Sequence, residues 1–240
     1  MDIKISGSGA IAAGEYKDIS VSGSAKCDGK IRCNSLRVSG SMKGMAIDAY
    51  EDIKVSGSVN FDGDVTTKNL KVSGGSKVGS CKASNDITVS GALKARGIHC
   101  AHLRSSGALK VEADIEAEEI VISGLIKCGG LMNAESIKIE AAGGSTIENI
   151  GGSNICIVSE KKGKIERLPL FSKILGNSGL SKLTVAQTIE GDSIAIEYVI
   201  AKQVIGKNVA VGAGCDIELV QYTDEIELSP DAKVAKYEKI

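Results

Sequence analysis

Apolar and polar residues alternate along the first two thirds of this chain, in pairs of apolar positions that enclose one outward residue. A spacing of two is the period of a β-strand with one buried face. Three such pairs recur before the pattern starts again, and short gaps separate them. The pattern therefore predicts turns of three short strands joined by tight bends. One complete turn has its apolar or small members at Leu109, Val111, Ile115, Ala117, Ile120 and Ile122.

A Ser-Gly pair marks every repeat, and the spacing between successive glycines is almost constant. A constant short period is typical of a stacked solenoid, whereas a β-sandwich has irregular strand and loop lengths. We therefore predict an all-β fold, a single-stranded parallel β-helix of triangular cross-section with about 17 residues per turn. The structural bend glycines are Gly7, Gly23, Gly40, Gly57, Gly74, Gly91, Gly107 and Gly124.

Turn-forming residues bracket the strand that leads to each of these glycines. Glycine at a sharp corner suggests a positive φ, which it adopts without a Cβ penalty. Asp and Asn favour turns because their side chains bond to nearby backbone groups. Residues of this kind stand just before the strand at Asp18, Asp52, Asn69 and Asp86.

The repeat divides the chain into three segments. Residues 1–159 are expected to form the regular β-helix, and residues 183–240 to add further turns and a cap. Between them, residues 160–182 are a basic amphipathic insertion or linker. Such a segment can lie on an anionic membrane surface or fold back on its own solenoid.

Composition narrows the classes of function. The formal net charge of −1 gives no overall attraction to nucleic acid or membranes. Met1 leads straight into an apolar pair and no apolar run approaches the length of a membrane span, so we expect no signal peptide and a cytoplasmic protein. The 7 cysteines include no CxxC pair, which indicates small buried hydrophobes rather than a metal site or disulfides.

The tandem Ile/Val-x-Val-Ser-Gly repeats resemble those of bactofilins, the polymer-forming bacterial cytoskeletal proteins. The resemblance implies a right-handed β-helix that joins end to end into filaments without nucleotide. The segment from Leu183 to Tyr222 resembles the tail of the longer, two-part bactofilins of Gram-positive bacteria. The motifs that carry this second resemblance are Leu183-Thr184-Val185, Thr188-Ile189-Glu190-Gly191-Asp192, Gly206-Lys207-Asn208-Val209, Gly212-Ala213-Gly214-Cys215 and Ile217-Glu218-Leu219-Val220-Gln221-Tyr222.

No residue stands out as catalytic, cofactor-binding or metal-binding, and we expect a structural protein rather than an enzyme. The alternative is an enzyme with a solenoid core, of the acyltransferase type, because two hexads near Gly206 and Gly212 resemble that repeat. Those enzymes use a histidine base. Here His99 and His102 lie in another region, and His102 takes a turn position that Asp or Glu holds elsewhere.

Two surface features are candidates for function. The outward residues of the strand before each Ser-Gly form a basic stripe, which is either a solvated face or a site for an anionic partner such as lipid headgroups. The N-terminal turn exposes Ile3 and Ile5. We expect two copies of the chain to associate head to head through this turn, so the main predicted partner is a second copy of the same protein. A membrane surface and cell-wall-associated proteins are further candidates, and nucleic acid is not. The stripe comprises Lys4, Arg37, Lys54, Lys71, Arg104 and Lys138.

The two ends of the predicted solenoid differ in charge. The first turn begins with apolar residues, whereas the last turn closes with a run of charged ones. Charged side chains on an edge strand discourage pairing with another chain. We therefore expect the C-terminal end to associate less readily. Its charged members are Asp231, Lys233, Lys236, Glu238 and Lys239.

Overall fold

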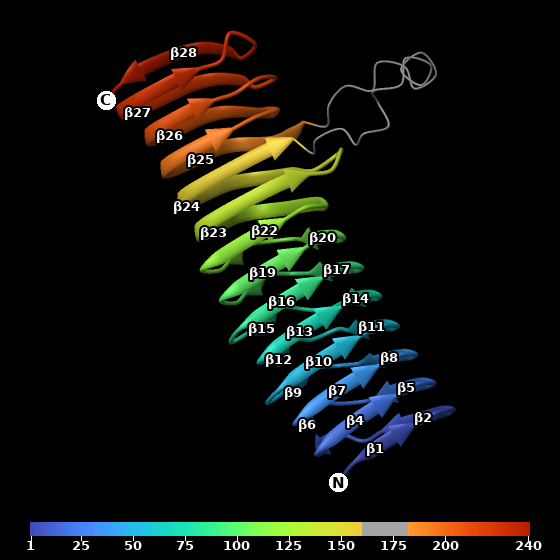
Figure 1. Ribbon diagram of the computed structural model, residues 1–240. Coiled ribbons are helices and arrows are strands. Elements are labelled where there is room, and N and C mark those ends of the chain that lie inside the picture. The colour runs from blue at the N-terminus through green and yellow to red at the C-terminus, as the bar shows by residue number, and fades with distance from the viewer. Residues whose placement is uncertain (160–181) are drawn as a thin grey trace, which may run out of the picture.

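The computed structural model describes residues 1–159 and 182–240, which form one elongated rod of stacked parallel strands (Figure 1). The N-terminus lies at one end of the rod and the C-terminus at the other. Every regular element in these two ranges is a strand, so the all-β solenoid is confirmed. The predicted insertion at 160–182 lies outside the described residues, apart from Lys182.

The strands from β1 to β22 form three parallel ladders, one for each face of the rod. The first ladder contains β1 (Ile3–Ile5), β4 (Asp18–Val21), β7 (Ser35–Val38), β10 (Asp52–Val55), β13 (Asn69–Val72), β16 (Asp86–Val89), β19 (His102–Ser105) and β22 (Glu119–Ile122). The second ladder contains β2 (Ser8–Ile11), β5 (Ser24–Cys27), β8 (Ser41–Gly44), β11 (Ser58–Phe61), β14 (Gly75–Lys77), β17 (Ala92–Ala95) and β20 (Ala108–Val111). The third ladder contains β3 (Gly14–Glu15), β6 (Ile31–Cys33), β9 (Ile47–Ala49), β12 (Val65–Thr67), β15 (Cys81–Ala83), β18 (Ile98–His99) and β21 (Ile115–Glu116).

Toward the C-terminus the strands lengthen, so that β23 to β27 each run through most of a turn, and the shorter β28 ends the rod. The pairing stays parallel throughout, and β24 pairs directly with β25. Ile147 aligns with Val185 and Ile157 with Ile196, so the stacking continues across the segment outside the described residues. The long strands are β23 (Leu125–Ala141), β24 (Thr146–Ser159), β25 (Leu183–Ile196), β26 (Val199–Val211), β27 (Asp216–Leu228) and β28 (Lys233–Lys239).

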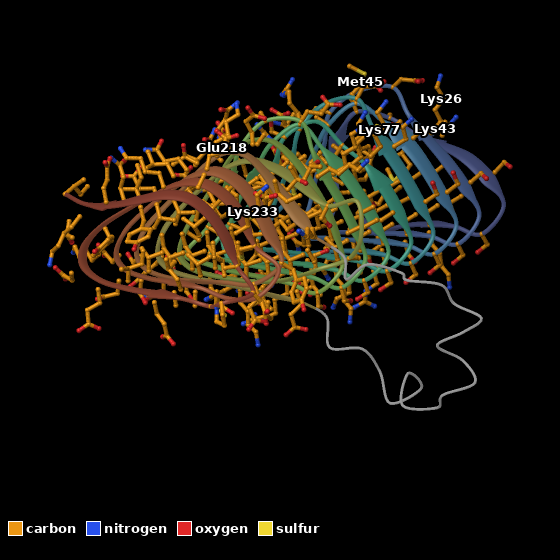
Figure 2. The ribbon with its side chains drawn as sticks, turned by 90° about the horizontal axis from the view of Figure 1, so that it is seen from above. Lys26, Lys43, Met45, Lys77, Glu218 and Lys233 are labelled. Carbon is orange, nitrogen blue, oxygen red and sulfur yellow. The ribbon has the colours of Figure 1, made fainter. Side chains whose placement is uncertain are left out.

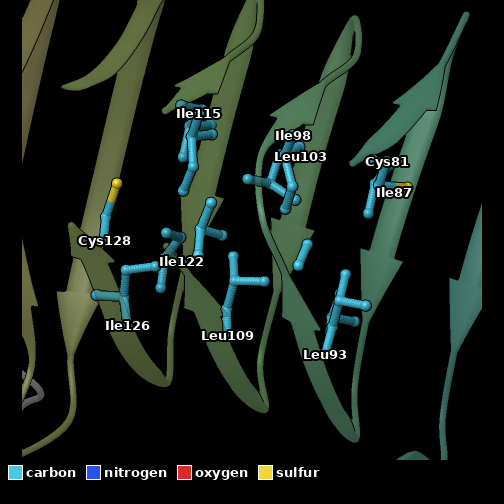
Figure 3. Close-up of a cluster of buried hydrophobic side chains, with 14 of the residues drawn as sticks. Cys81, Ile87, Leu93, Ile98, Leu103, Leu109, Ile115, Ile122, Ile126 and Cys128 are labelled. Atoms are coloured by element: carbon cyan, nitrogen blue, oxygen red, sulfur yellow. The ribbon is translucent and has the colours of Figure 1, made fainter. Parts of the chain in front are cut away.

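The inward side chains of all three ladders meet in one continuous apolar core. Ile19 stacks between Ile3 of the turn before it and Leu36 of the turn after it. Figure 3 shows how inward side chains such as Leu93 and Leu109 repeat from turn to turn. The alternating apolar pattern thus supplies the core, and the predicted length of the repeat is confirmed because one repeat forms one turn.

The bend glycines are required for a different reason from the one expected. Among the glycines, positive φ values occur at Gly14, Gly144 and Gly214 and not at the Ser-Gly bends, so the expectation of positive φ there is wrong. Each bend after the first instead lies in close contact with the backbone of the turn before it. A Cβ at Gly57 would lie 2.7 Å from the Ser39 carbonyl carbon, and closer still to carbonyl oxygens of Ser39 and Gly40.

Polar side chains stack at the corner where the first ladder begins. Asn69 donates from Nδ2 to Oδ1 of Asp52 at 2.9 Å, and the Ser35 hydroxyl donates to Oδ1 of Asp18 at 2.5 Å. The corner residues therefore bond mainly to one another between turns, whereas the sequence had suggested bonds to nearby backbone. These contacts fix the stagger of neighbouring turns.

Candidate functional site

The N-terminal end of the rod is an open sheet edge. Within the described residues, β1, β2 and β3 each pair on one side only, with β4, β5 and β6. Ile3 and Ile5 occupy core positions, aligned with Ile19 and Val21, but they are only half-buried because no turn covers them. Unpaired backbone groups beside exposed apolar side chains form a template for another strand.

Gly7 shows how closely another chain could approach this end. The Cβ positions of later bend glycines point at the preceding turn, where Gly23 faces the carbonyl groups of Ser6 and Gly7. A Cβ at Gly7 would meet no atom within 4 Å, because it belongs to the first turn. Gly7 therefore leaves its backbone uncovered toward the N-terminal end, where each later bend glycine has the backbone of the preceding turn.

The C-terminal end also exposes residues at core positions. Val234 aligns with the buried Ile217, and Tyr237, which is 57% exposed, aligns with the buried Val220. The charged residues of this turn lie on the wall of the rod instead, where Lys233 pairs with Asp216 at 3.1 Å. Lys236 likewise pairs with Glu238 on this turn. That charge limits association at this end stays a prediction.

The predicted basic stripe is a real column, since Arg37, Lys54 and Lys71 are aligned in adjacent turns of the first ladder. Much of its charge is neutralised by acidic residues of the same face. Such exposed pairs contribute little to stability, but they weaken the attraction for an anion. The ion pairs of the stripe are Lys54–Asp52 at 2.9 Å, Arg104–Glu119 at 2.8 Å and Lys138–Glu140 at 3.6 Å.

Comparison with known proteins agrees with this architecture. Residues 1–82 match the family model of the bactofilins, which is described as polymer-forming cytoskeletal. This N-terminal part of the chain is similar to a bactofilin domain. The resemblance drawn from the Ser-Gly repeats is thereby confirmed for the N-terminal third of the rod.

Two curated relatives come from Bacillus subtilis (strain 168), and both are named as uncharacterized. YhbF is 30% identical over 112 residues, which is 46% of this chain and 42% of that protein. YhbE is 30% identical over 111 residues, which is 46% of this chain and 44% of that protein. The match thus spans less than half the length of either relative. No solved structure gives a significant match.

The two histidines of this bactofilin-like chain lie on exposed surface and pair with carboxylates. His99 Nδ1 is 3.0 Å from Oε2 of Glu116, and His102 Nδ1 is 2.9 Å from Oδ1 of Asp86. Across residues 1–159 and 182–240 there is no group of three His, Cys, Asp or Glu residues that could hold a metal ion. In the same ranges no helix has the length and apolar character needed to cross a membrane.

The cysteines are free thiols, and all but Cys156 are buried. Burial raises the pKa of Cys81 to about 12 and that of Cys100 to about 12. Burial also raises the pKa of Cys33, to about 11. A buried thiol that stays protonated is a poor nucleophile and a poor metal ligand. The interpretation of these cysteines as small core residues is confirmed for the buried members.

Proposed function

We propose that this chain is a structural protein that associates with itself through the ends of its solenoid, forming oligomers or filaments. The observation that carries the proposal is the uncovered N-terminal turn, with Ile3 and Ile5 at core positions beside unpaired strand edges. The bactofilin match supports it, since that family is described as polymer-forming.

The simplest contact is head to head. A two-fold axis through the N-terminal end would set β1 of one copy beside β1 of another, with Ile3 and Ile5 packed against their copies. The edge residues would gain the hydrogen-bond partners that every internal turn already has. Because Gly7 has no Cβ, the two bends could also approach at the distance seen inside the rod.

The C-terminal end supplies a second contact. Tyr237 is exposed there and Val234 is only partly buried, and the last half of β27 pairs with β26 but has no partner strand on its other side in the described part of the chain. One contact at each end turns a pair of rods into a filament.

Substitution at the N-terminal turn tests the proposal. Ile3→Lys with Ile5→Lys places two charges in the contact, and light scattering coupled to size-exclusion chromatography should show a loss of mass toward the monomer. The matched control, Ser20→Lys with Thr88→Lys, adds the same charge at outward positions of the first ladder and should keep the wild-type mass. Circular dichroism checks that both variants are folded. A wild type that is monomeric at high concentration, or a folded Ile3/Ile5 variant with unchanged mass, would contradict the proposal.

A structural role fits this chain better than acyl transfer. A transferase would need one of the histidines as a base in a substrate site, yet neither His99 nor His102 is among the residues that line the hollows of about 650 Å³ and about 570 Å³ on the rod. A cytoskeletal role implies a cytoplasmic location, and partners at a membrane surface or among cell-wall-associated proteins stay predictions. Calorimetry with an acyl-CoA gives the direct comparison, because the structural account predicts no binding heat and tight binding would favour the enzyme.

A further inference from the structure

A column of lysines runs along the outer face of the second ladder. Each member stands at the same place after a bend glycine, and the strand register places it directly beside the next. Asn60 interrupts the series in one turn. Stacked turns lie about 4.8 Å apart, so this lysine column repeats a positive charge at nearly that spacing. Its members are Lys26, Lys43, Lys77, Lys94, Lys110 and Lys127.

Most lysines of the column have no acidic partner within the described residues. Two of its members have an ion pair within the described residues, Lys26 with Asp28 and Lys94 with Glu112, both at exposed positions. The pKa of Glu112 is held below its ordinary value by its hydrogen bond to Lys94 and by the charges of Lys94, Lys110 and Lys77, so the positive field extends over several turns.

The third ladder has a different charge pattern. On the third ladder the outward column mixes signs, since Glu15, Arg32 and Asp48 follow one another in register. Arg32 pairs with Glu15 at 3.2 Å, so adjacent turns attract one another there. Like charges set directly opposite each other destabilise a sheet, as they must in the lysine column. The second ladder therefore carries an unfavourable arrangement that the third ladder avoids, and that ion pairs such as Lys54–Asp52 relieve in part on the first ladder.

Small side chains beside the lysines leave a shallow trough along the same face. Gly75, Ala92 and Ala108 are aligned in three successive turns, and each begins the strand that carries a lysine of the column. An open hollow of about 570 Å³ follows these residues and includes Lys77, Lys94 and Lys110 in its lining. Figure 2 shows Lys26, Lys43 and Lys77 on the same side of the rod. The face thus has room for an extended chain along the axis.

We propose that this trough binds a linear polyanion of the phosphate type, laid along the rod so that successive anionic groups meet successive lysines. Lysine binds phosphate as a point charge, and repeated weak contacts on one chain add up through high effective concentration. The binding offsets the repulsion within the column. The proposal does not depend on self-association, because every lysine of the column belongs to one chain.

The shape of the face favours such a polymer over other anionic partners. Stable attachment to a bilayer usually combines basic residues with apolar side chains that enter the lipid. The larger apolar residues that line the trough are the buried Val59, Leu93 and Leu109 and the partly buried Leu125, so they offer little to insert. Single-stranded nucleic acids are usually held by aromatic side chains that stack on bases, and the outward residues of the second ladder in the described chain include none.

The test uses the full chain and fluorescently labelled long-chain inorganic polyphosphate, followed by anisotropy at increasing salt. The variant Lys77→Gln with Lys94→Gln and Lys110→Gln removes three consecutive charges and keeps most of each side chain. Its matched control, Arg37→Gln with Lys54→Gln and Lys71→Gln, removes three consecutive charges from the first ladder. Each triple also breaks one exposed ion pair, so the two variants differ chiefly in which face has lost its charge.

We expect wild type and control to bind alike, and the lysine-column variant to bind at least ~10-fold more weakly. Its plot of log K against log salt should be shallower by about 2–3. Long-chain polyphosphate should bind at least ~10-fold more tightly than tripolyphosphate. Equal losses in both triples, or equal affinity for the short and long chains, would overturn the proposal. So would binding to phosphatidylglycerol vesicles without binding to polyphosphate.

Discussion

A methyl group at an internal bend should disrupt the rod, because the bends of neighbouring turns touch through their backbones. In Gly57→Ala the new Cβ would lie 2.7 Å from the Ser39 carbonyl carbon, shorter than the 3.0 Å below which Cβ contacts essentially never occur. The two turns must therefore separate locally. That movement stretches the hydrogen bonds from Gly57 N to Val38 O, now 3.1 Å, and from Ser58 N to Gly40 O, now 2.8 Å.

The size of the effect follows from these two contributions. Weakening two backbone hydrogen bonds costs about 1–3 kcal/mol, and forcing an extra methyl group into a close-packed contact costs about 1–3 kcal/mol more. We therefore expect Gly57→Ala to lower the free energy of unfolding by roughly 2–6 kcal/mol. Guanidinium denaturation followed by far-ultraviolet circular dichroism measures this loss.

Two other glycines give matched controls. Gly7 occupies the same bend position in the first turn, and Gly75 follows the bend of another turn, and at neither would a Cβ have any atom within 4 Å. Gly7→Ala and Gly75→Ala should change the free energy of unfolding of the monomer by no more than about 0.5–1 kcal/mol. If Gly57→Ala unfolds with either control, the bends do not make the backbone contact described here and the reasoning fails.

Other predictions concern titration and thiol chemistry. Hydrogen bonds from Asn69 and Lys54 lower the pKa of the Asp52 carboxyl, so the ionised group stabilises the fold above its ordinary pKa of 3.8 and this stabilisation is lost as the pH falls through the lower folded value. Asn69→Ala should therefore lower the melting temperature more at pH 7 than at pH 3. An equal loss at both pH values would contradict this. Burial raises the pKa of Cys81 and Cys100 to about 12, so the free energy of unfolding should fall as the pH rises above the ordinary thiol pKa of 9.0 and toward about 12. Thermal melts across that range should show a smaller fall in melting temperature for Cys81→Ala than for the wild type. Iodoacetamide at pH 8 should label the half-exposed Cys156 before any buried cysteine, as peptide mass spectrometry can measure. Equal labelling of all cysteines in the folded chain would argue against the packed core.

The sequence predicted the solenoid well because one sequence repeat corresponds to one turn of the rod. Gly57 and Gly74 are one turn apart, and every inward position follows at a fixed distance from them. It did not reveal why these positions are glycine, because the clash arises between turns and not within the bend itself. Local turn chemistry suggested positive φ, while the cause is the close approach of two backbones.

The surface was predicted less well than the core. The lysine column was missed although it has a clear sequence signal, since Lys77 and Lys94 each follow a bend glycine at the same spacing. The predicted basic stripe considered only the outward residues of the strand before each Ser-Gly pair. At the C-terminal end, Tyr237 lies one turn after the buried Val220, a step that continues the core register. The charged residues around Tyr237 made this core position hard to recognise, because composition does not tell which side chains of a strand point toward the core.

The central claim is that the rod joins end to end through its uncovered turns, and electron microscopy of the purified protein tests it most directly. We predict rods longer than one chain, joined at their ends and collinear, which in the Ile3→Lys, Ile5→Lys variant become no longer than two rods joined at their C-terminal ends. Single rods of wild-type protein at every concentration, or rods associated side by side along their walls, would contradict the account.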